Sequence, residues 1–574
     1  MSGPDPHRPR RWTFRAWGLA VAASTLLLMI ATESRLSIVW DEGFTLGREA
    51  RIRAWFRALR DPERFAATWQ PPNPNLELVQ QDRYPAPRPD QIRTRAQLFD
   101  KDVLAWFWPF AREEPHGHPP FYAIVGLAGD LLTPRWDELP RARLGPMLLF
   151  SLTAGALWTF AAQRRGRWAA TLAAGAWVFQ PNLFANGHYA TVDAILASLW
   201  VLALIAFAEA VLPLTQTTVE SRSPRWGWVI LFGLLAGWAA DCKLTGWFLP
   251  LPFLAWTAVE RSRRGFLTLL VGGLIAALTL YAFNPSWWNA PIDGVRRFLE
   301  SNLTRSRTIP IPVLFLGQVY VTPKQSLPWY NTLAWTLFVT PVGFLALAIV
   351  GTGQAIRKFK SRPFEILAVL HWSFLLALRA LPHTPGHDGV RQFLPAFGML
   401  AVVASLGAAA LIESFGRWGK VIVASALVEG ALSIALMMPV PLSYFSPIVG
   451  GLPGAAKLGM EPTYFWDALT GDALDWLNDH TPRNQRIEFA TFPTSWLYLH
   501  QSGRLKPDLI PDPRQPAAWF VLQNRPGALQ PWDRALIANG QPAYVVSKWG
   551  VPLVWIYPAH ERQSMLPAQG YGTQ

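Results

Sequence analysis

The sequence is poor in cysteine and in charge. It contains one cysteine, Cys242, among 574 residues, and only 16% of its residues are charged. A single cysteine excludes an intramolecular disulfide and a zinc or iron–sulfur site built from cysteines. A soluble chain of this length would form several domains, whose surfaces would need about 25% charged residues. No P-loop pattern is present either, so the composition argues against a soluble protein with that type of nucleotide site.

Apolar and aromatic side chains are abundant instead. Hydrophobic residues make up 51% of the chain and aromatic residues 13%, which excludes intrinsic disorder. The 30 tryptophans outnumber the 12 tyrosines, and tryptophan is enriched at membrane interfaces. The net charge of +14 is carried largely between apolar runs, where it fits membrane orientation and contact with anionic lipids. We therefore predict a membrane protein that binds no nucleic acid.

Eleven apolar runs approach the length of about 20 residues that a bilayer-spanning helix needs. They are Ala16–Thr32, Leu144–Ala162, Trp168–Phe184, Val192–Leu212, Trp226–Ala240, Trp247–Val259, Phe266–Phe283, Leu333–Thr352, Phe364–Leu381, Phe393–Ile412 and Val421–Met438. The first run follows several arginines but precedes no clear small-x-small cleavage site. We interpret it as an uncleaved span rather than a signal peptide.

Basic connections between these runs predict the topology. With eleven spans, five of them fall on the side of the N-terminus: Arg164–Arg167, Arg222–Arg225, Arg261–Arg264, Arg357–Arg362 and Arg417–Lys420. Positively charged loops favour the cytoplasm. We therefore expect an inner or plasma membrane protein with a cytoplasmic N-terminus and a periplasmic C-terminal domain. Pro119–Leu132 is apolar but short, and we expect it to lie at the outer interface, because a twelfth span would reverse the basic loops.

Three parts follow from this pattern. Residues 1–15 form a cytoplasmic N-terminus, and residues 16–438 form an all-α transmembrane domain with exoplasmic segments 33–143 and 284–331. Residues 439–574 form a small soluble α/β domain on the exoplasmic face. Its predicted elements are a helix at Gly471–His480, strands at Arg486–Phe492 and Ala517–Gln523, and a hairpin of Ala543–Lys548 with Val551–Tyr557.

Two adjacent carboxylates, Asp41 and Glu42, follow the first span within a few residues. One interpretation is catalytic, with Asp41 as a general base that takes a proton from a hydroxyl. The other is structural, because acidic residues favour the N-terminus of a helix and Gly43–Leu59 has an amphipathic helical pattern.

Further polar residues gather at the same predicted outer interface. His116, His118 and Tyr122 begin the short apolar segment, where two histidines could ligate a divalent metal. With no cysteine in this segment and no H-x-x-x-H helix, we expect no metal and no other cofactor. The remaining candidates for substrate binding are Arg141, Arg143, His188, Asp193, Lys243, His387, Asp388 and Arg391. Arginine and lysine suit a phosphate, but Lys243 could equally pair with Asp241, and Arg391 with Asp388.

One carboxylate lies inside a predicted span. Glu429 is in the middle of the eleventh run, and an ionisable residue at that depth is a functional candidate. No lysine or arginine lies in the middle of another run, so a protonated, hydrogen-bonded side chain is the simpler interpretation.

The order of these motifs resembles a known family. An acidic pair after the first span, then His-Pro-Pro-Phe-Tyr, then arginine before the second span is similar to GT-C fold glycosyltransferases. The resemblance is to the dolichyl-phosphate-mannose–protein mannosyltransferase superfamily, which includes bacterial aminoarabinose transferases of lipid A. It covers about residues 15–260 and continues through Gly187–Trp200 and Gly233–Pro252.

The resemblance implies a function. A sugar carried on a polyprenyl phosphate would pass, with inversion, to a hydroxyl of a lipid, glycan or protein on the exoplasmic face. The family's acidic pair maps onto Asp41 and Glu42, with Asp41 as the base. The β-trefoil module of the eukaryotic mannosyltransferases is missing from the outer segments, so protein O-mannosylation does not follow. The alternatives are a transporter or flippase of a lipid-linked saccharide, and a scaffold acting through the C-terminal domain.

Overall fold

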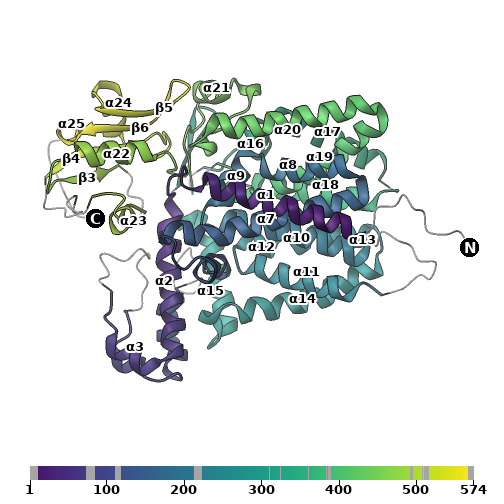
Figure 1. Ribbon diagram of the computed structural model, residues 1–574, viewed down its shortest axis with the longest axis horizontal. Coiled ribbons are helices and arrows are strands. Elements are labelled where there is room, and N and C mark those ends of the chain that lie inside the picture. The colour runs from purple at the N-terminus through teal and green to yellow at the C-terminus, as the bar shows by residue number, and fades with distance from the viewer. Residues whose placement is uncertain are drawn as a thin grey trace, which may run out of the picture.

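The computed structural model describes residues 11–72, 85–109, 118–212, 223–308, 311–322, 325–359, 361–382, 384, 389–490, 495–506, 509 and 516–566. A bundle of nearly parallel and antiparallel helices forms most of the protein (Figure 1). The C-terminal α/β domain lies beyond one end of the bundle, and α1 begins at the other end. The predicted helical membrane protein with a small α/β domain is thereby confirmed.

Seven described helices have the length and composition to cross a membrane. They are α1 (Arg11–Glu33), α7 (Glu138–Arg165), α10 (Val192–Val211), α14 (Arg263–Ala282), α18 (Pro363–Ala380), α19 (Pro395–Phe415) and α20 (Arg417–Met437). Four further predicted runs fall on shorter helices, namely α8 (Arg167–Val178), α11 (Trp226–Ala240), α13 (Pro250–Val259) and α17 (Val342–Arg357). These have 12, 15, 10 and 16 residues, below the length of a full span.

Proline breaks two of the predicted spans. The run from Trp168 divides at Gln180 into α8 and α9 (Pro181–His188), and the run from Leu333 divides into α16 (Asn331–Val339) and α17. Proline lacks the backbone N–H that would continue a helix. The two breaks meet, because Nε2 of Gln180 donates to the carbonyl oxygen of Val339 at 3.0 Å.

Glu429 supports the second break. Its carboxylate accepts from the backbone nitrogens of Val342 at 2.6 Å and Gly343 at 2.7 Å, and so caps the N-terminus of α17. A negative charge or acceptor is favourable at this position because the first N–H groups of a helix have no partner within it. The structure thus assigns the intramembrane carboxylate a hydrogen-bonded, helix-capping role.

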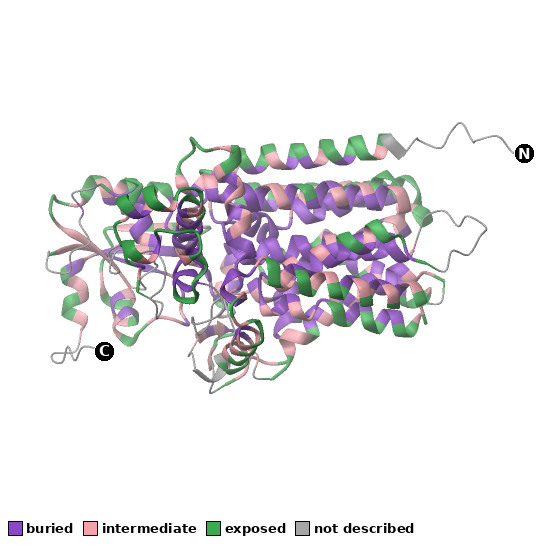
Figure 2. Ribbon diagram, turned by 90° about the horizontal axis from the view of Figure 1, so that it is seen from below, coloured by how far each residue is buried: buried purple, intermediate pink, exposed green. Residues whose placement is uncertain are grey.

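The centre of the bundle is α10. All but one of its 20 residues are buried, and it packs against α7, α11 and α19. Figure 2 shows buried residues filling the interior and exposed ones on the outer helices. Peripheral α14 shows the contrast, since Phe266, Leu270, Leu274 and Leu278 are each at least 60% exposed. Apolar side chains on such an outer face suit contact with lipid tails rather than water.

Short elements cover the end of the bundle near the α/β domain. Helix α2 (Trp40–Arg60) runs across this end, at a large angle to the bundle helices (Figure 1). The others are α3 (Pro62–Thr68), η2 (Pro89–Gln91), η3 (Gln97–Phe99), α4 (Lys101–Phe107), α12 (Leu244–Trp247), η4 (Pro285–Trp287), α15 (Pro291–Thr308) and η5 (Arg391–Phe393). The segment Pro119–Leu132 forms two helices, α5 (Phe121–Gly126) and α6 (Ala128–Leu132), which are too short to span a bilayer. A hairpin of β1 (Ile311–Phe315) and β2 (Gln318–Thr322) is an addition that the helical pattern did not predict.

The C-terminal domain is built on a four-stranded sheet with the order β3-β4-β6-β5. Its strands are β3 (Arg486–Phe489), β4 (Ala517–Gln523), β5 (Tyr544–Lys548) and β6 (Val551–Pro558); β3 pairs with β4 in parallel, and the other pairs are antiparallel. The helices and turns of this part are η6 (Pro441–Ser443), η7 (Pro447–Val449), α21 (Gly451–Lys457), α22 (Gly471–His480), α23 (Ser495–Gln501), α24 (Pro531–Asn539) and α25 (Ala559–Met565). The sequence predicted that the first of these strands would extend to Phe492. In the structure β3 ends at Phe489, and residues 491–494 lie outside the described part.

Candidate active site

Four charged residues from distant parts of the chain meet at the bundle end that faces the α/β domain. Asp41 lies in the first turn of α2 (Trp40–Arg60), and Asp193 lies in the first turn of α10. Lys243 directly precedes α12, and Arg391 begins η5. Each lies at an end of a helix, so folding the bundle brings residues as far apart as 350 positions to one level.

These residues form a continuous series of ion pairs, which we call the ion-pair chain. Nε of Arg391 donates to Oδ2 of Asp193 at 2.8 Å, and its Nη2 donates to Oδ2 of Asp41. Nζ of Lys243 donates to Oδ1 of Asp193 at 2.8 Å. Asp193 therefore holds two cations, while Asp41 shares one of them.

Access to the ion-pair chain is uneven. The side chain of Asp193 is fully buried and those of Arg391 and Lys243 are 5% and 6% exposed, whereas that of Asp41 is 32% exposed. Burial lowers the pKa of Lys243, while the charge of Asp193 opposes this shift. Asp41 is thus the member that a molecule entering from this end meets first.

A segment of the C-terminal domain, Tyr464–Asp467, covers the ion-pair chain. The guanidinium carbon of Arg391 lies 3.5 Å from the ring centroid of Phe465, in a cation–π contact. Trp466 packs on Trp40, which precedes Asp41, with ring centroids 4.6 Å apart. Rings from the tail therefore contact Arg391 and the residue that precedes Asp41.

The same segment is anchored to the bundle and to its own domain. The hydroxyl of Tyr464 donates to Oδ1 of Asn182 in α9. The guanidinium carbon of Arg525 lies 4.0 Å from the ring centroid of Trp466. Asp467 is 1% exposed, and burial raises the pKa of its carboxyl to about 6.

Glu42 holds the turn that carries Asp41. Its carboxylate accepts from Nε and Nη2 of Arg143, both at 2.7 Å, and from two backbone amides at 3.0 Å. Arg143 also donates to Oε1 of Glu33 at 2.9 Å. The side chains of Glu42 and Arg143 are fully buried, so their hydrogen-bonding groups serve the protein itself. One of these amides is the Val39 N–H, and this bond caps α2, as the structural interpretation of the acidic pair predicts.

Other candidates lie close to α2 or inside the bundle. The hydroxyl of Tyr122 accepts from Nη1 of Arg48, and the ring of His118 stands edge-on to Tyr122 with centroids 6.4 Å apart. His188 is fully buried, with Nε2 lying 3.0 Å from Oγ1 of Thr32 and Nδ1 lying 2.8 Å from a carbonyl oxygen. His188 therefore packs within the helices, away from the ion-pair chain.

The structure also shows which carboxylates Lys243 and Arg141 contact. Lys243 pairs with Asp193 rather than with Asp241, whose carboxylate is buried and accepts no hydrogen bond among the residues described. Burial raises the pKa of Asp241 well above its usual range. Nε of Arg141 lies 2.9 Å from Oδ1 of Asp130 in a partly exposed ion pair.

His116, His387 and Asp388 lie outside the described residues. Within the described part of the chain, no three His, Cys, Asp or Glu side chains are grouped to hold a metal. Cations for an anionic ligand, by contrast, are supplied by Arg391 and Lys243.

Sequence reasoning missed the tail segment. Phe465 and Trp466 supply rings beside Arg391 and Trp40, but this segment follows the last predicted span at a distance. The one available signal was its composition, because an aromatic run ending in an acid repeats the Trp40-Asp41 combination.

Comparison with known proteins confirms the predicted resemblance. Residues 118–288 match the family described as dolichyl-phosphate-mannose-protein mannosyltransferase. This segment contains His118, Tyr122, Asp193 and Lys243 but ends before Arg391. Comparison with curated protein sequences gives no match.

The fold is similar to that of solved glycosyltransferase-type structures. The crystal structure of ArnT from Cupriavidus metallidurans, bound to undecaprenyl phosphate, superposes with a TM-score of 0.51 at 15% identity, covering 96% of this chain and 99% of that one. The archaeal oligosaccharyltransferase AglB from Archaeoglobus fulgidus, in complex with an inhibitory peptide and a dolichol-phosphate, gives 0.45 at 13%, covering 92% and 72%. The chain thus has the GT-C type of fold, and its segment 118–288 carries the mannosyltransferase family pattern.

Proposed function

We propose that the protein is a membrane glycosyltransferase that moves a sugar from a polyprenyl-phosphate donor to an acceptor hydroxyl. The fold shared with ArnT, whose structure holds undecaprenyl phosphate, and the family pattern of residues 118–288 support this class. The reaction takes place at the bundle end that faces the α/β domain, which is the periplasmic side if the basic loops lie in the cytoplasm. The acceptor hydroxyl belongs to a lipid, glycan or protein.

The observation that carries the proposal is the ion-pair chain. Two cations, Arg391 and Lys243, lie at the membrane level where the phosphate of a polyprenyl lipid would be. Guanidinium and ammonium groups suit a phosphate, and in a buried site they stabilise the charge that develops on it as it leaves. The ion-pair chain also includes a partly exposed carboxylate, that of Asp41, directly beside one of these cations.

In this proposal, donor binding prepares the base. The incoming phosphate competes with Asp41 for the guanidinium of Arg391, while Asp193 keeps that guanidinium and Lys243 in position. Asp41 is then released toward the acceptor. Glu42 and Arg143 act as positioning residues, because they fix the first turn of α2 without reaching the substrate.

The transfer step balances without a further reactant. The acceptor oxygen attacks the anomeric carbon from the face opposite the phosphate, and Asp41 takes the hydroxyl proton. The bond between the anomeric carbon and the phosphate oxygen breaks, and polyprenyl phosphate leaves with the electron pair. The product is inverted at that carbon, because one displacement occurs and no sugar–enzyme bond forms.

The test replaces Asp41 by asparagine in cells that lack the native gene. Loss of a general base lowers turnover by about 100-fold or more. Mass spectrometry of lipid extracts should then show one glycosyl polyprenyl phosphate accumulating, as in the deletion strain. Asp293→Asn, an exposed carboxylate on α15, serves as the matched control and should restore wild-type levels.

Binding provides the second readout. Undecaprenyl phosphate should raise the melting temperature of purified Asp41→Asn at least as much as that of the wild type, because the phosphate no longer displaces a charged competitor. A well-folded variant with normal lipid levels would refute Asp41 as the base. It would favour the flippase or the scaffold, neither of which needs this carboxylate.

A further inference from the structure

A second group of cations lies at the opposite end of the bundle. Helix α7 connects the two regions, with Arg143 beside the candidate active site and Arg164 near the other end. The 21 residue steps from Arg143 to Arg164 span about 32 Å at 1.5 Å per residue. This matches the hydrocarbon thickness of about 30 Å, so Arg164 lies at the other membrane surface.

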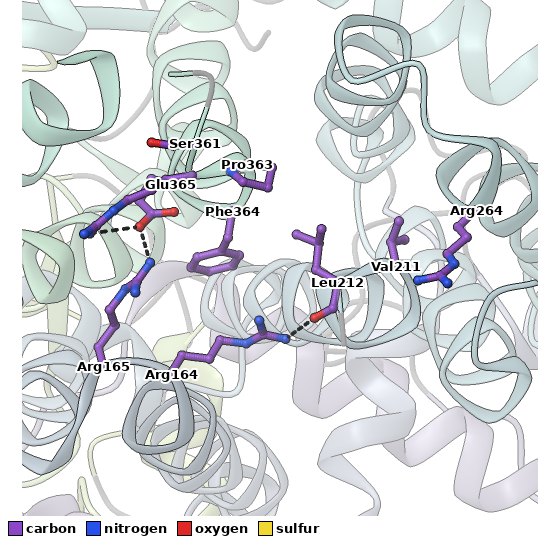
Figure 3. Close-up of a pocket in the computed structure, with 10 residues that line it drawn as sticks. Arg164, Arg165, Val211, Leu212, Arg264, Ser361, Pro363, Phe364 and Glu365 are labelled. Carbon is purple, nitrogen blue, oxygen red and sulfur yellow. Dashed lines mark hydrogen bonds and ion pairs between the residues drawn. The ribbon is translucent and has the colours of Figure 1, made fainter. Parts of the chain in front are cut away.

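These cations line a pocket of about 430 Å³ between the ends of α7 and α10 and the starts of α14 and α18 (Figure 3). Its lining residues are Arg164, Arg165, Val211, Leu212, Arg264, Ser361, Arg362, Pro363, Phe364 and Glu365. The volume falls within the range of about 300–1,000 Å³ that small-molecule sites occupy. Arginines come from both sides of the pocket, since Arg165 and Arg264 lie on opposite sides of it in Figure 3.

Positive charge exceeds negative charge here. Glu365, whose side chain is 3% exposed, pairs with Arg165 and lies 3.5 Å from Nη1 of Arg362. Glu209 lies nearby and holds Arg164 at 2.9 Å and Arg225 at 2.8 Å. Together with Arg264, the described residues in and beside the pocket thus include five arginines and two glutamates. The adjoining residues 213–222 add one acid and one base by sequence and leave the excess unchanged.

One donor in the pocket wall has no acceptor. Nε of Arg164 is buried and makes no hydrogen bond to the described protein, although Nη2 donates to Glu209 and to the carbonyl oxygen of Leu212 at 2.8 Å. An unpaired buried donor costs free energy, so the fold leaves this guanidinium incompletely satisfied. A phosphate oxygen can bind the part of the guanidinium that stays accessible, since the side chain is 13% exposed.

The pocket opens at a lipid–water boundary. Trp168, Trp226 and Trp418 are 41%, 48% and 61% exposed, and each lies in the first turn of a helix that starts at this end. Exposed tryptophans of this kind mark the headgroup level. Val211, Leu212 and Phe364 give the pocket an apolar part beside its cations.

We propose that this pocket binds the phosphate headgroup of an anionic phospholipid from the leaflet opposite the candidate active site. Basic pockets between spanning helices at such a surface suit anionic headgroups. A lipid fits better than free phosphate, because the apolar wall and the exposed apolar face of α14, beginning at Phe266, accommodate glycerol and acyl groups. The site is independent of the proposed transfer reaction.

The experiment measures lipid binding to the full-length protein by native mass spectrometry in detergent. Dioleoyl-phosphatidylglycerol and dioleoyl-phosphatidylcholine are titrated separately, with inorganic phosphate as a third arm. We expect the anionic lipid to bind at least about tenfold more tightly than the zwitterionic one. A tenfold difference in affinity corresponds to about 1.4 kcal/mol, which is the size expected for one charge-assisted contact.

Two double variants locate the site. Arg264→Gln with Arg362→Gln removes two lining cations but leaves Arg164 and Arg165 to neutralise the buried glutamates. We expect it to abolish the preference for phosphatidylglycerol. Arg167→Gln with Arg263→Gln removes two exposed cations at the same end that do not line the pocket, and it should keep the preference.

Three results would overturn the proposal: equal affinity for both lipids, equal loss in both double variants, or protein saturated by inorganic phosphate without retaining lipid. If the pocket double variant does not fold, the single variants Arg264→Gln and Arg362→Gln replace it, and each should weaken phosphatidylglycerol binding by about threefold or more. An unchanged affinity in both would equally refute the site.

Discussion

Asp193 offers the sharpest test of the candidate site, because it neutralises two buried cations with one carboxylate. Replacing Asp193 by asparagine leaves Lys243 without the carboxylate that holds it, while Arg391 retains Asp41. The pKa of Lys243, already lowered by burial, should fall further, because the charge that opposes this shift is gone.

The expected magnitude follows from the burial of the pair. Removing one partner of a buried ion pair costs about 3–5 kcal/mol, since the other charge stays in a medium of low polarity. Asp193→Asn should lose stability in this range, whereas Lys243→Met should lose less, because Asp193 keeps its bond to Arg391. The double variant should cost about as much as the larger single change rather than their sum, because the unpaired charge has been removed.

Unfolding in mixed micelles titrated with sodium dodecyl sulfate would measure these free energies. Asp293 and Arg296 on α15 provide the control, since their ion pair at 2.9 Å has side chains 47% and 61% exposed. Asp293→Asn should change stability by no more than about 1 kcal/mol. Additive losses for Asp193→Asn and Lys243→Met would show that the two side chains do not depend on each other, and would refute the ion-pair chain.

Three further outcomes follow from the structure. Arg391→Lys should raise the donor KM by about tenfold, because an ammonium cannot reproduce the planar paired donors of a guanidinium, and Arg391→Ala should also lower kcat; steady-state kinetics with unchanged constants for Arg391→Lys would contradict phosphate binding. Burial raises the pKa of Asp467 to about 6 from 3.8, so its stabilising proton is present at pH 4 and is lost as the pH rises through 6. Asp467→Asn should therefore melt higher than the wild type at pH 8, by a margin on the order of 3 kcal/mol in stability that vanishes at pH 4; a margin that does not change with pH in melting curves would be evidence against this. Chelation with EDTA should leave transfer activity intact, because Arg391 and Lys243 suffice for a phosphate; complete loss that one divalent ion restores would instead implicate His116, His118 and Asp41 in a metal site.

Helices were predictable from the sequence because apolar runs of span length leave few alternatives in a bilayer. The interruptions were harder. Pro181 and Pro341 lie within apolar stretches, and the hydrophobic pattern continues across both of them. At the Pro341 break, Gln180 and Glu429 from distant parts of the chain satisfy the freed backbone groups. Such long-range capping leaves no periodic signal in a single sequence.

The candidate site was partly predictable for the same reason. Asp41, Asp193, Lys243 and Arg391 stood out because charges are conspicuous at the ends of apolar runs. Their pairing did not, since sequence proximity favoured Asp241 for Lys243. The structure replaces this neighbour with a carboxylate 50 positions away. Glu42 and Arg143 looked equivalent to the others, and only their bonds to each other and to backbone atoms separate the support from the site.

The segment Tyr464–Asp467 bears on how this protein can be recombined. Its rings contact Arg391 and Trp40, and Tyr464 bonds to α9, so the C-terminal domain completes the charged group that the bundle begins. The two parts therefore form a matched set rather than interchangeable modules. A chimera that joins this bundle to another enzyme's tail should insert into the membrane yet remain inactive, unless that tail carries this four-residue junction, whose tyrosine binds Asn182 of the bundle.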